Sequence, residues 1–170
     1  MLAHRVIFVA LVLTLAVCCA ASCGRKEAEI NGIGQWVLLK TELRQAPGFC
    51  NPEQEITFCS ANGSVPLGGQ RADVNLYFRG GELDSKLIEI ELFVRRCDAA
   101  ALRTVLTQEL GTPNTQKNNH YFWRSKSSFI AGTIPDDDGR RCIVSFVAPD
   151  DEQRIADLTS EAETTAKSSP

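Results

Sequence analysis

The chain has 170 residues, and its 18 Lys and Arg against 21 Asp and Glu give a formal net charge of −3. An acidic balance argues against general affinity for nucleic acid, which needs a clustered positive surface. The length suits one domain with enough chain to bury a real core. Composition therefore points away from nucleic-acid partners and predicts a single domain.

The N-terminal residues have the three-part layout of a signal peptide. Arg5 is the only full charge at the start, and Val6–Val17 is an apolar run broken only by Thr14. A run of about a dozen residues suits a signal-peptide core, whereas a membrane-spanning helix needs roughly 20. We predict a signal peptide over residues 1–22 and export from the cytosol. A retained membrane helix is the alternative, because apolar residues continue to Ala21.

A cysteine after small residues ends this leader. The segment Ala20-Ala21-Ser22-Cys23-Gly24 resembles the bacterial lipobox, which usually has Leu where this chain has Ala20. The resemblance implies that Cys23 is the first mature residue and carries acyl chains, which anchor durably when several are attached. Gly24 in place of Asp implies an outer-membrane lipoprotein facing the periplasm, with residues 23–34 as a polar tether. Ordinary cleavage near Ala21, giving a secreted protein, is the alternative.

Four cysteines remain once the two in the leader and Cys23 are set aside. They are Cys50, Cys59, Cys97 and Cys142. An even number in an exported domain indicates two disulfides, with three alternative connectivities. We favour Cys50–Cys59, which closes a local loop, and Cys97–Cys142, which joins two strand-like segments. Unpaired buried thiols are the alternative, and a zinc site is disfavoured because the chain has no Cys-x-x-Cys spacing.

The first part of the domain shows short strand signals between turn residues. Residues 36–39 predict a first strand and residues 41–45 a helical turn, and Pro and Gly then predict a loop. Residues 55–60 predict a short strand. Residues 62–70 hold four Gly and Pro residues and predict irregular structure.

The clearest element is a hairpin over residues 73–79 and 86–96, joined by the loop at 80–84. Strict alternation of apolar and other residues is typical of a half-buried antiparallel strand. Glu89 and Glu91 point away from the apolar face. That face consists of Val74, Leu76, Phe78, Ile88, Ile90, Leu92 and Val94.

A helix follows the hairpin, and a strand-rich segment follows the helix. Asp98 is a natural N-cap and Gly111 a natural end, because Pro113 cannot continue a helix. Strands are predicted over residues 120–124, 128–134 and 142–147. A last helix is predicted from near Asp150, and residues 161–170 are predicted to be a disordered tail.

These elements predict an α+β fold with a single domain over residues 35–160. The sheet is antiparallel and consists of the hairpin plus a three-strand meander. One main helix packs on a face of this sheet, and a second helix lies at the C-terminus.

Residues with catalytic or metal-binding chemistry are few. His120 is the only histidine outside the leader, and it lies in a strand-like aromatic segment, so we interpret it as structural. No Gly-x-Ser-x-Gly elbow occurs. The acidic run 136–138 lacks the Glu that closes a calcium-binding EF-hand loop, because position 147 is Val. We therefore expect no catalytic residue, no metal and no cofactor.

Aromatic side chains offer the candidate ligand surface. Trp36, Tyr77 and Trp123 can line a groove, because such rings combine a large contact area with a polar group. Packing into the core is the alternative reading of the same residues. The basic pairs Arg95-Arg96 and Arg140-Arg141 are either solvated or in contact with acidic partners or lipid head groups.

One segment resembles small bacterial lipoproteins of the SmpA/OmlA type and uncharacterised exported lipoprotein domains. It consists of a helix, Leu110-Gly111-Thr112-Pro113, a polar stretch and an aromatic strand with Trp123. The chain departs from that type by placing a cysteine-bearing hairpin before the helix. The resemblance implies a periplasm-facing lipoprotein module and transfers no functional residue.

The sequence therefore predicts a non-enzymatic binding or envelope-accessory module, held to the membrane by lipid at Cys23 and with a protein of the envelope as its partner. The alternative is a secreted enzyme or enzyme inhibitor whose groove sequence periodicity does not reveal.

Overall fold

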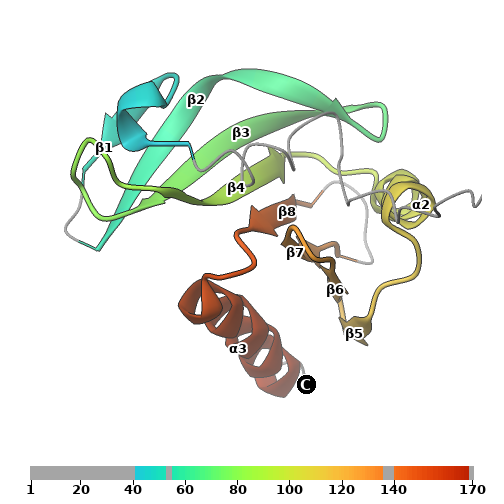
Figure 1. The fold of residues 1–170 in the computed structure, drawn as a ribbon. Coiled ribbons are helices and arrows are strands. Elements are labelled where there is room, and N and C mark those ends of the chain that lie inside the picture. Colours follow the sequence, from blue (N-terminus) through green and yellow to red (C-terminus); the bar gives the residue numbers. More distant parts are fainter. Residues whose placement is uncertain (1–40, 53–54, 136–139, 169–170) are drawn as a thin grey trace, which may run out of the picture.

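The computed structural model describes residues 41–52, 55–135 and 140–168. In this part of the chain, eight strands form one antiparallel sheet in the order β1-β2-β3-β4-β8-β7-β6-β5 (Figure 1). The strands are β1 (Phe49–Asn51), β2 (Ile56–Leu67), β3 (Gln70–Arg79), β4 (Leu87–Val94), β5 (Thr115–Lys117), β6 (His120–Arg124), β7 (Phe129–Thr133) and β8 (Cys142–Val147). The helices are the short 3-10 helix η1 (Leu43–Gln45), α2 (Ala99–Leu110) and α3 (Glu152–Ser168).

The α+β class is confirmed, but the sheet is larger than the predicted hairpin plus meander. The predicted signal peptide, Cys23, the tether, Trp36 and the strand at 36–39 lie outside the described residues, as does the acidic run 136–138.

The expectation of irregular structure at residues 62–70 is wrong. These residues form the second half of β2, the turn and the start of β3, with Leu67 opposite Gln70. Gly68 and Gly69 have φ values of +59° and +74°, which suits the two-residue turn of a tight hairpin. A register shift between Ser60 and Ser64 absorbs the extra residues. Within the described sheet, the part of β2 beyond Ser60 pairs with β3 and not with β1, so it is an edge, and Pro is tolerated in such an edge position.

The hairpin of β3 and β4 and the helix after it form where the sequence predicted them. Leu76 pairs with Ile90 and Val74 with Leu92, which puts the alternating apolar residues on one face. At the start of α2, the carboxylate of Asp98 accepts a hydrogen bond from the backbone N–H of Ala101 at 2.9 Å, as an N-cap does.

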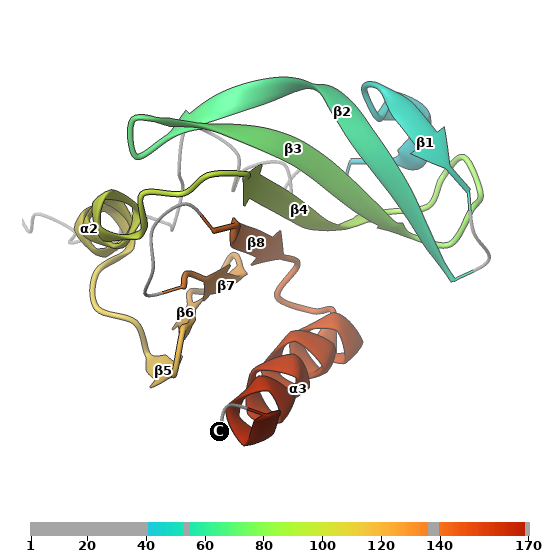
Figure 2. The same ribbon diagram turned by 180° about the vertical axis from the view of Figure 1, so that it is seen from behind.

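The two helices pack on opposite faces of the sheet, so the molecule has three layers (Figure 2). We call the face that α2 covers the α2 side. Leu102 and Leu106 of α2 join its buried cluster, which includes Leu76, Ile90, Leu92, Val144 and Phe146. We call the other face the α3 side, where Ile155 and Ala162 pack against Phe122, Phe129 and Val147.

The prediction of a disordered tail from residue 161 is also wrong, because α3 continues to Ser168. The sequence has no Gly or Pro between Glu152 and Pro170, and Ala162 is fully buried. Lys117 on β5 also donates a hydrogen bond to Glu163 at 2.6 Å. Tertiary contact therefore extends a helix that local propensity alone leaves undecided.

Two disulfides join the pairs favoured from the sequence. Cys50 and Cys59 lie directly opposite each other on β1 and β2. Cys97, just after β4, is bonded to Cys142 at the start of β8, across 45 residues of sequence. The second bond ties the two halves of the sheet together beside its central strand pair.

Candidate ligand groove

A polar groove of about 540 Å³ lies on the α3 side of the sheet. Its walls come from β2, β3, β4 and the start of β8. The groove is lined by Ser60, Ala61, Gly63, Arg71, Asp73, Asn75, Glu91, Phe93, Arg95 and Ile143. Arginine, acidic and amide side chains thus converge on the open strand surface next to α3.

Glu91 projects into this groove from β4, the strand at the centre of the sheet. Its carboxylate accepts a hydrogen bond from the amide of Asn75 at 2.7 Å and a longer one from the hydroxyl of Tyr77 at 3.4 Å. Burial raises the pKa of Glu91, the Asn75 hydrogen bond opposes the rise, and the charge of Glu89 adds to it. Glu91 is therefore a partly desolvated acid whose two contacts are both with neutral donors.

Tyr77 remains a hydrogen-bond donor in this setting. Burial is the main reason that the pKa of its hydroxyl is raised, and the negative charges of Glu91 and Glu89 act in the same direction. Its ring also packs at 5.5 Å, centroid to centroid, from Phe58 on β2. Tyr77 therefore forms part of the surface beside the groove and holds Glu91 in place.

Glu89 lies two residues before Glu91 on the same side of β4 and has no exposed surface. One of its oxygens, Oε2, accepts a hydrogen bond from Nε of Arg154 on α3. The other, Oε1, is buried without a hydrogen-bond partner among the described residues. The Arg154 guanidinium also lies 5.8 Å from the centre of the Tyr77 ring. Within the described part of the chain, Glu89 therefore has a cation in contact and Glu91 does not.

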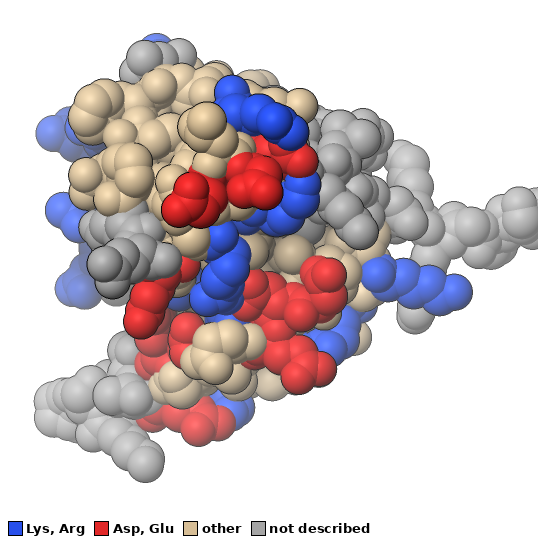
Figure 3. Space-filling view, turned by 60° about the vertical axis from the view of Figure 1, so that its left-hand side comes forward, with Lys and Arg blue, Asp and Glu red and all other residues tan. Residues whose placement is uncertain are grey.

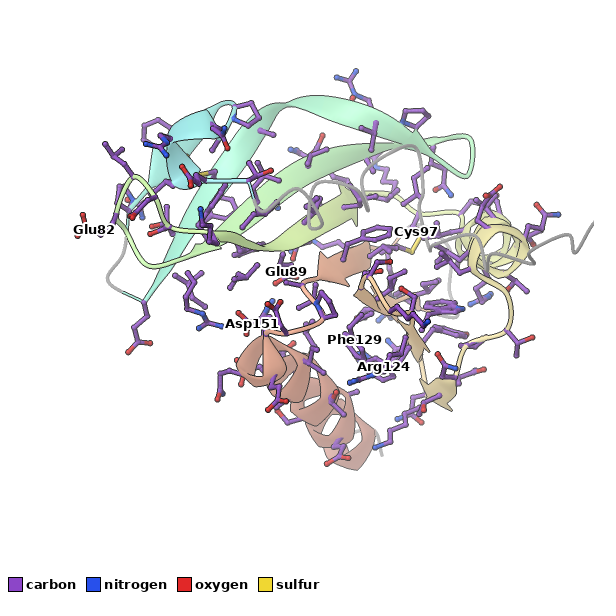
Figure 4. All side chains as sticks on the ribbon, in the orientation of Figure 1. Glu82, Glu89, Cys97, Arg124, Phe129 and Asp151 are labelled. Atoms are coloured by element: carbon purple, nitrogen blue, oxygen red, sulfur yellow. A yellow bond between two sulfur atoms is a disulfide. The ribbon has the colours of Figure 1, made fainter. Side chains whose placement is uncertain are left out.

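The start of α3 is fixed against the sheet close to this pair, and Figure 4 shows Glu89 and Asp151 where β4 meets the helix. Asp151 accepts two hydrogen bonds from Arg79, at 2.5 and 2.7 Å, and one from the backbone N–H of Arg154 at 2.9 Å. Burial opposes the change, but these hydrogen bonds lower the pKa of Asp151. Figure 3 shows Asp and Glu side chains gathered over the lower part of that view, with Lys and Arg among them.

The outer end of the groove carries arginines. Arg95 donates a hydrogen bond to Asp73 at 3.0 Å, and Arg141 lies 5.7 Å from the centre of the Phe93 ring. Asp73 pairs with Phe93 in the sheet, and Arg71, two residues before Asp73, and Arg95, two residues after Phe93, both line the groove at this end. Arg71 has no ion-pair partner among the described residues. This end of the groove is therefore positive, whereas the Glu91 end is negative.

The structure does not bring the predicted aromatic surface together. By register, Tyr77 lies on the α3 side, and Trp123 lies on the α2 side with Ile130 and Phe146. Trp123 is buried, and its indole N–H donates to the carbonyl of Gly111 at 2.9 Å. Trp123 therefore has the core role that was the alternative reading.

His120 lies away from the groove, on β6 beneath α3. Its Nδ1 is 3.2 Å from the hydroxyl of Thr133, and its Nε2 is buried without a hydrogen-bond partner among the described residues. Burial lowers the pKa of His120, against the nearby charge of Glu161. Its place under the helix agrees with the structural role expected from the sequence.

Glu89 and Glu91 were not predicted as functional residues. The sequence analysis correctly placed them on the side of the strand opposite the apolar face, but it assigned them no role. The sequence did contain a signal for this site, because two acids occupy successive positions on the same side of the predicted strand. In the hairpin, Tyr77 lies opposite Glu89 and Asn75 lies opposite Glu91. The sequence did not predict that α3 brings Arg154 into contact with Glu89.

The chain matches no protein-family model, no curated protein and no solved structure. Among the helices described, none is long and apolar enough to cross a membrane. In the same part of the chain, no three side chains of His, Cys, Asp or Glu are grouped as metal ligands. The candidate site is therefore argued from its own geometry.

Proposed function

We propose that this protein is an exported, lipid-anchored binding module without catalytic function, and that it binds its partner in the groove on the α3 side. The observation that carries the binding role is Glu91, a partly buried acid in an open groove. Among the described residues, its side-chain hydrogen bonds come from the neutral donors Asn75 and Tyr77. Buried charges are normally paired, so a side chain of this kind favours a partner that completes the pairing.

The arrangement of the helices supports the same role. Helix α3 packs against Phe122, Phe129 and Val147, whereas the groove lies over β2, β3 and β4. A sheet surface left open with charged and aromatic side chains is a common place for recognition, because specificity comes from a few placed polar groups.

Export and anchoring rest on the leader, on the lipobox-like segment ending in Cys23, and on the disulfides. Disulfides persist in oxidising compartments and are rare in the cytosol. The two bonds in the domain, Cys50–Cys59 and Cys97–Cys142, therefore support maturation outside the cytosol.

Intact-mass analysis of the protein purified from its own cells tests the anchor. We expect the chain to begin at Cys23 and to carry the added mass of a diacylglycerol group, and the Cys23→Ser variant to lack it. A mature protein of the same mass and membrane distribution for both forms would contradict lipidation. A start near residue 22 without added mass would indicate the secreted alternative.

Photo-crosslinking from single positions tests the binding role of the groove. A photoreactive phenylalanine analogue replaces Ser60 in the groove, and in a matched control it replaces Gln108, which is exposed on α2. We expect position 60 to form one discrete crosslinked product with a protein of the envelope, and position 108 to form none. No adduct from either position, or equal adducts from both, would contradict a partner site in the groove.

A further inference from the structure

We propose that the groove binds a short extended peptide by both of its free ends, with the terminal ammonium on Glu91 and the terminal carboxylate between Arg71 and Arg95. This inference rests on the proposed function and names the ligand class of the same groove. Three independent features carry it: the charge left over at each end and the distance between them.

The inner end of the groove has one negative charge in excess. Arg154 contacts Glu89, while among the described residues the carboxylate of Glu91 receives hydrogen bonds from the neutral donors Asn75 and Tyr77. An ammonium group supplies three donors and one positive charge, which is the complement that Glu91 lacks.

The outer end has positive charge in excess. Arg71 on β3 and Arg95, which follows the last residue of β4, both line this end of the groove. Among the described residues, Arg95 is paired through its hydrogen bond to Asp73, and Arg71 has no ion-pair partner. Two guanidinium groups that line the same end of a groove repel each other. A carboxylate bound between the two guanidinium groups removes this repulsion, because the planar guanidinium group matches carboxylate geometry.

The spacing between the ends selects the length of the ligand. Glu91 lies on β4, and Arg95 follows four residues later, directly after the strand ends at Val94. A strand rises about 3.3 Å per residue, so the two positions are at most about 13 Å apart. An extended peptide spans at most about 3.3–3.6 Å per residue, so a tetrapeptide matches this distance. The side chains of Phe93 and Ile143 line the groove and give its middle an apolar surface.

Isothermal titration of the full mature chain with tetraglycine tests the inference. The comparison ligands are N-acetyl-tetraglycine, tetraglycine amide and diglycine. We expect tetraglycine to bind, and loss of either terminal charge to weaken binding at least about tenfold, as for a lost hydrogen bond to a charged group. Diglycine is too short to reach both ends and should bind more weakly than tetraglycine.

Two variants assign the ends. Glu91→Gln should remove the difference between tetraglycine and its N-acetyl form, and Arg71→Gln the difference between tetraglycine and its amide. Arg71 is exposed, so its variant tests the outer end independently of Glu91→Gln. The matched control Glu82→Gln lies in the loop before β4, on an exposed side chain, and should bind like the wild type.

Absence of tetraglycine binding would overturn the peptide assignment, and so would equal binding of the free and end-blocked forms. If the groove crosslinks to an envelope partner but tetraglycine does not bind, the ligand class is wrong and the proposed function stands. If neither occurs, both fail.

Discussion

The α2 side and the α3 side of the sheet are made by the same strands, yet they bury different side chains. On the α2 side, Leu76, Ile90 and Phe146 form a continuous apolar core with Leu106 of the helix. On the α3 side, the apolar cluster under α3 covers only part of the sheet, and Glu89 and the groove occupy the neighbouring strands. The difference teaches that the α2 side supplies most of the apolar burial that stabilises the fold. The α3 side retains polar groups whose hydrogen bonds a ligand can complete.

This division has a physical reason. Apolar burial is non-directional and contributes in proportion to area, so the α2 side is stabilised without any partner. Buried polar groups contribute only when their hydrogen bonds are complete, and Glu89 and His120 each keep one buried atom without a partner among the described residues. Stability on the α3 side therefore depends on single contacts and on pH.

The largest effect is expected from breaking the ion pair on the α3 side. Arg154→Met leaves the carboxylate of Glu89 buried without its cation, and we expect the free energy of unfolding to fall by about 3–5 kcal/mol. In the double variant with Glu89→Leu, no charge is left buried, and most of the stability should return. Urea denaturation of both variants measures this. If the single and double variants are equally unstable, the loss in the single variant does not come from the buried charge of Glu89, and the account of this ion pair is contradicted.

Truncation of the apolar side should have the next largest effect. Leu106→Ala removes a fully buried side chain of α2, and we expect a loss of about 3 kcal/mol from transfer and cavity terms. The matched change Leu158→Ala on α3 affects a half-buried side chain and should cost roughly 1 kcal/mol. Equal losses in urea denaturation would contradict the difference between the two sides.

Replacing the groove acid should increase stability at neutral pH. The raised pKa of Glu91 means that its charged form is disfavoured in the folded state, so its contribution improves as pH falls towards that pKa. Glu91→Gln should therefore be more stable than the wild type at pH 7, with a smaller advantage near pH 5. Calorimetry at both values checks this. A less stable variant at pH 7 would show that the carboxylate already has a sufficient partner.

The smallest effect concerns the histidine beneath α3. Because its pKa is lowered, folded His120 binds a proton less readily than the unfolded chain does. Its contribution to stability is complete above the ordinary histidine pKa and declines as pH falls from there through the lowered value. His120→Gln should reduce the loss of stability between pH 7 and pH 5. An unchanged dependence of stability on pH would show that burial does not lower the pKa of His120.

Local sequence patterns predicted the elements that depend on local rules. The alternation around Ile90, the Asp98 cap and the strands at 120–124 and 142–147 were all predictable, because periodicity and capping chemistry determine them. The second half of β2 was missed because Pro66 and the glycines argue for a loop unless an unpaired edge and a tight turn are known. The end of α3 was missed because it depends on packing against β5 and β6.

The candidate site was predictable only in part. Tyr77 was chosen for its aromatic character, and it does lie beside the groove. Trp123 was chosen for the same reason and is buried on the α2 side. The charge pattern of the groove arises from the register between β3 and β4 and from the placement of α3, which no local pattern contains.

The central claim is that the open surface of β3 and β4 on the α3 side is where this protein binds its ligand. Amide chemical-shift mapping of the ¹⁵N-labelled mature chain during a tetraglycine titration tests it most directly. The account predicts the largest shifts at Asn75, Glu91 and Phe93, with α2 unchanged. Shifts centred on α2 and Trp123, with β3 and β4 unaffected, would contradict it.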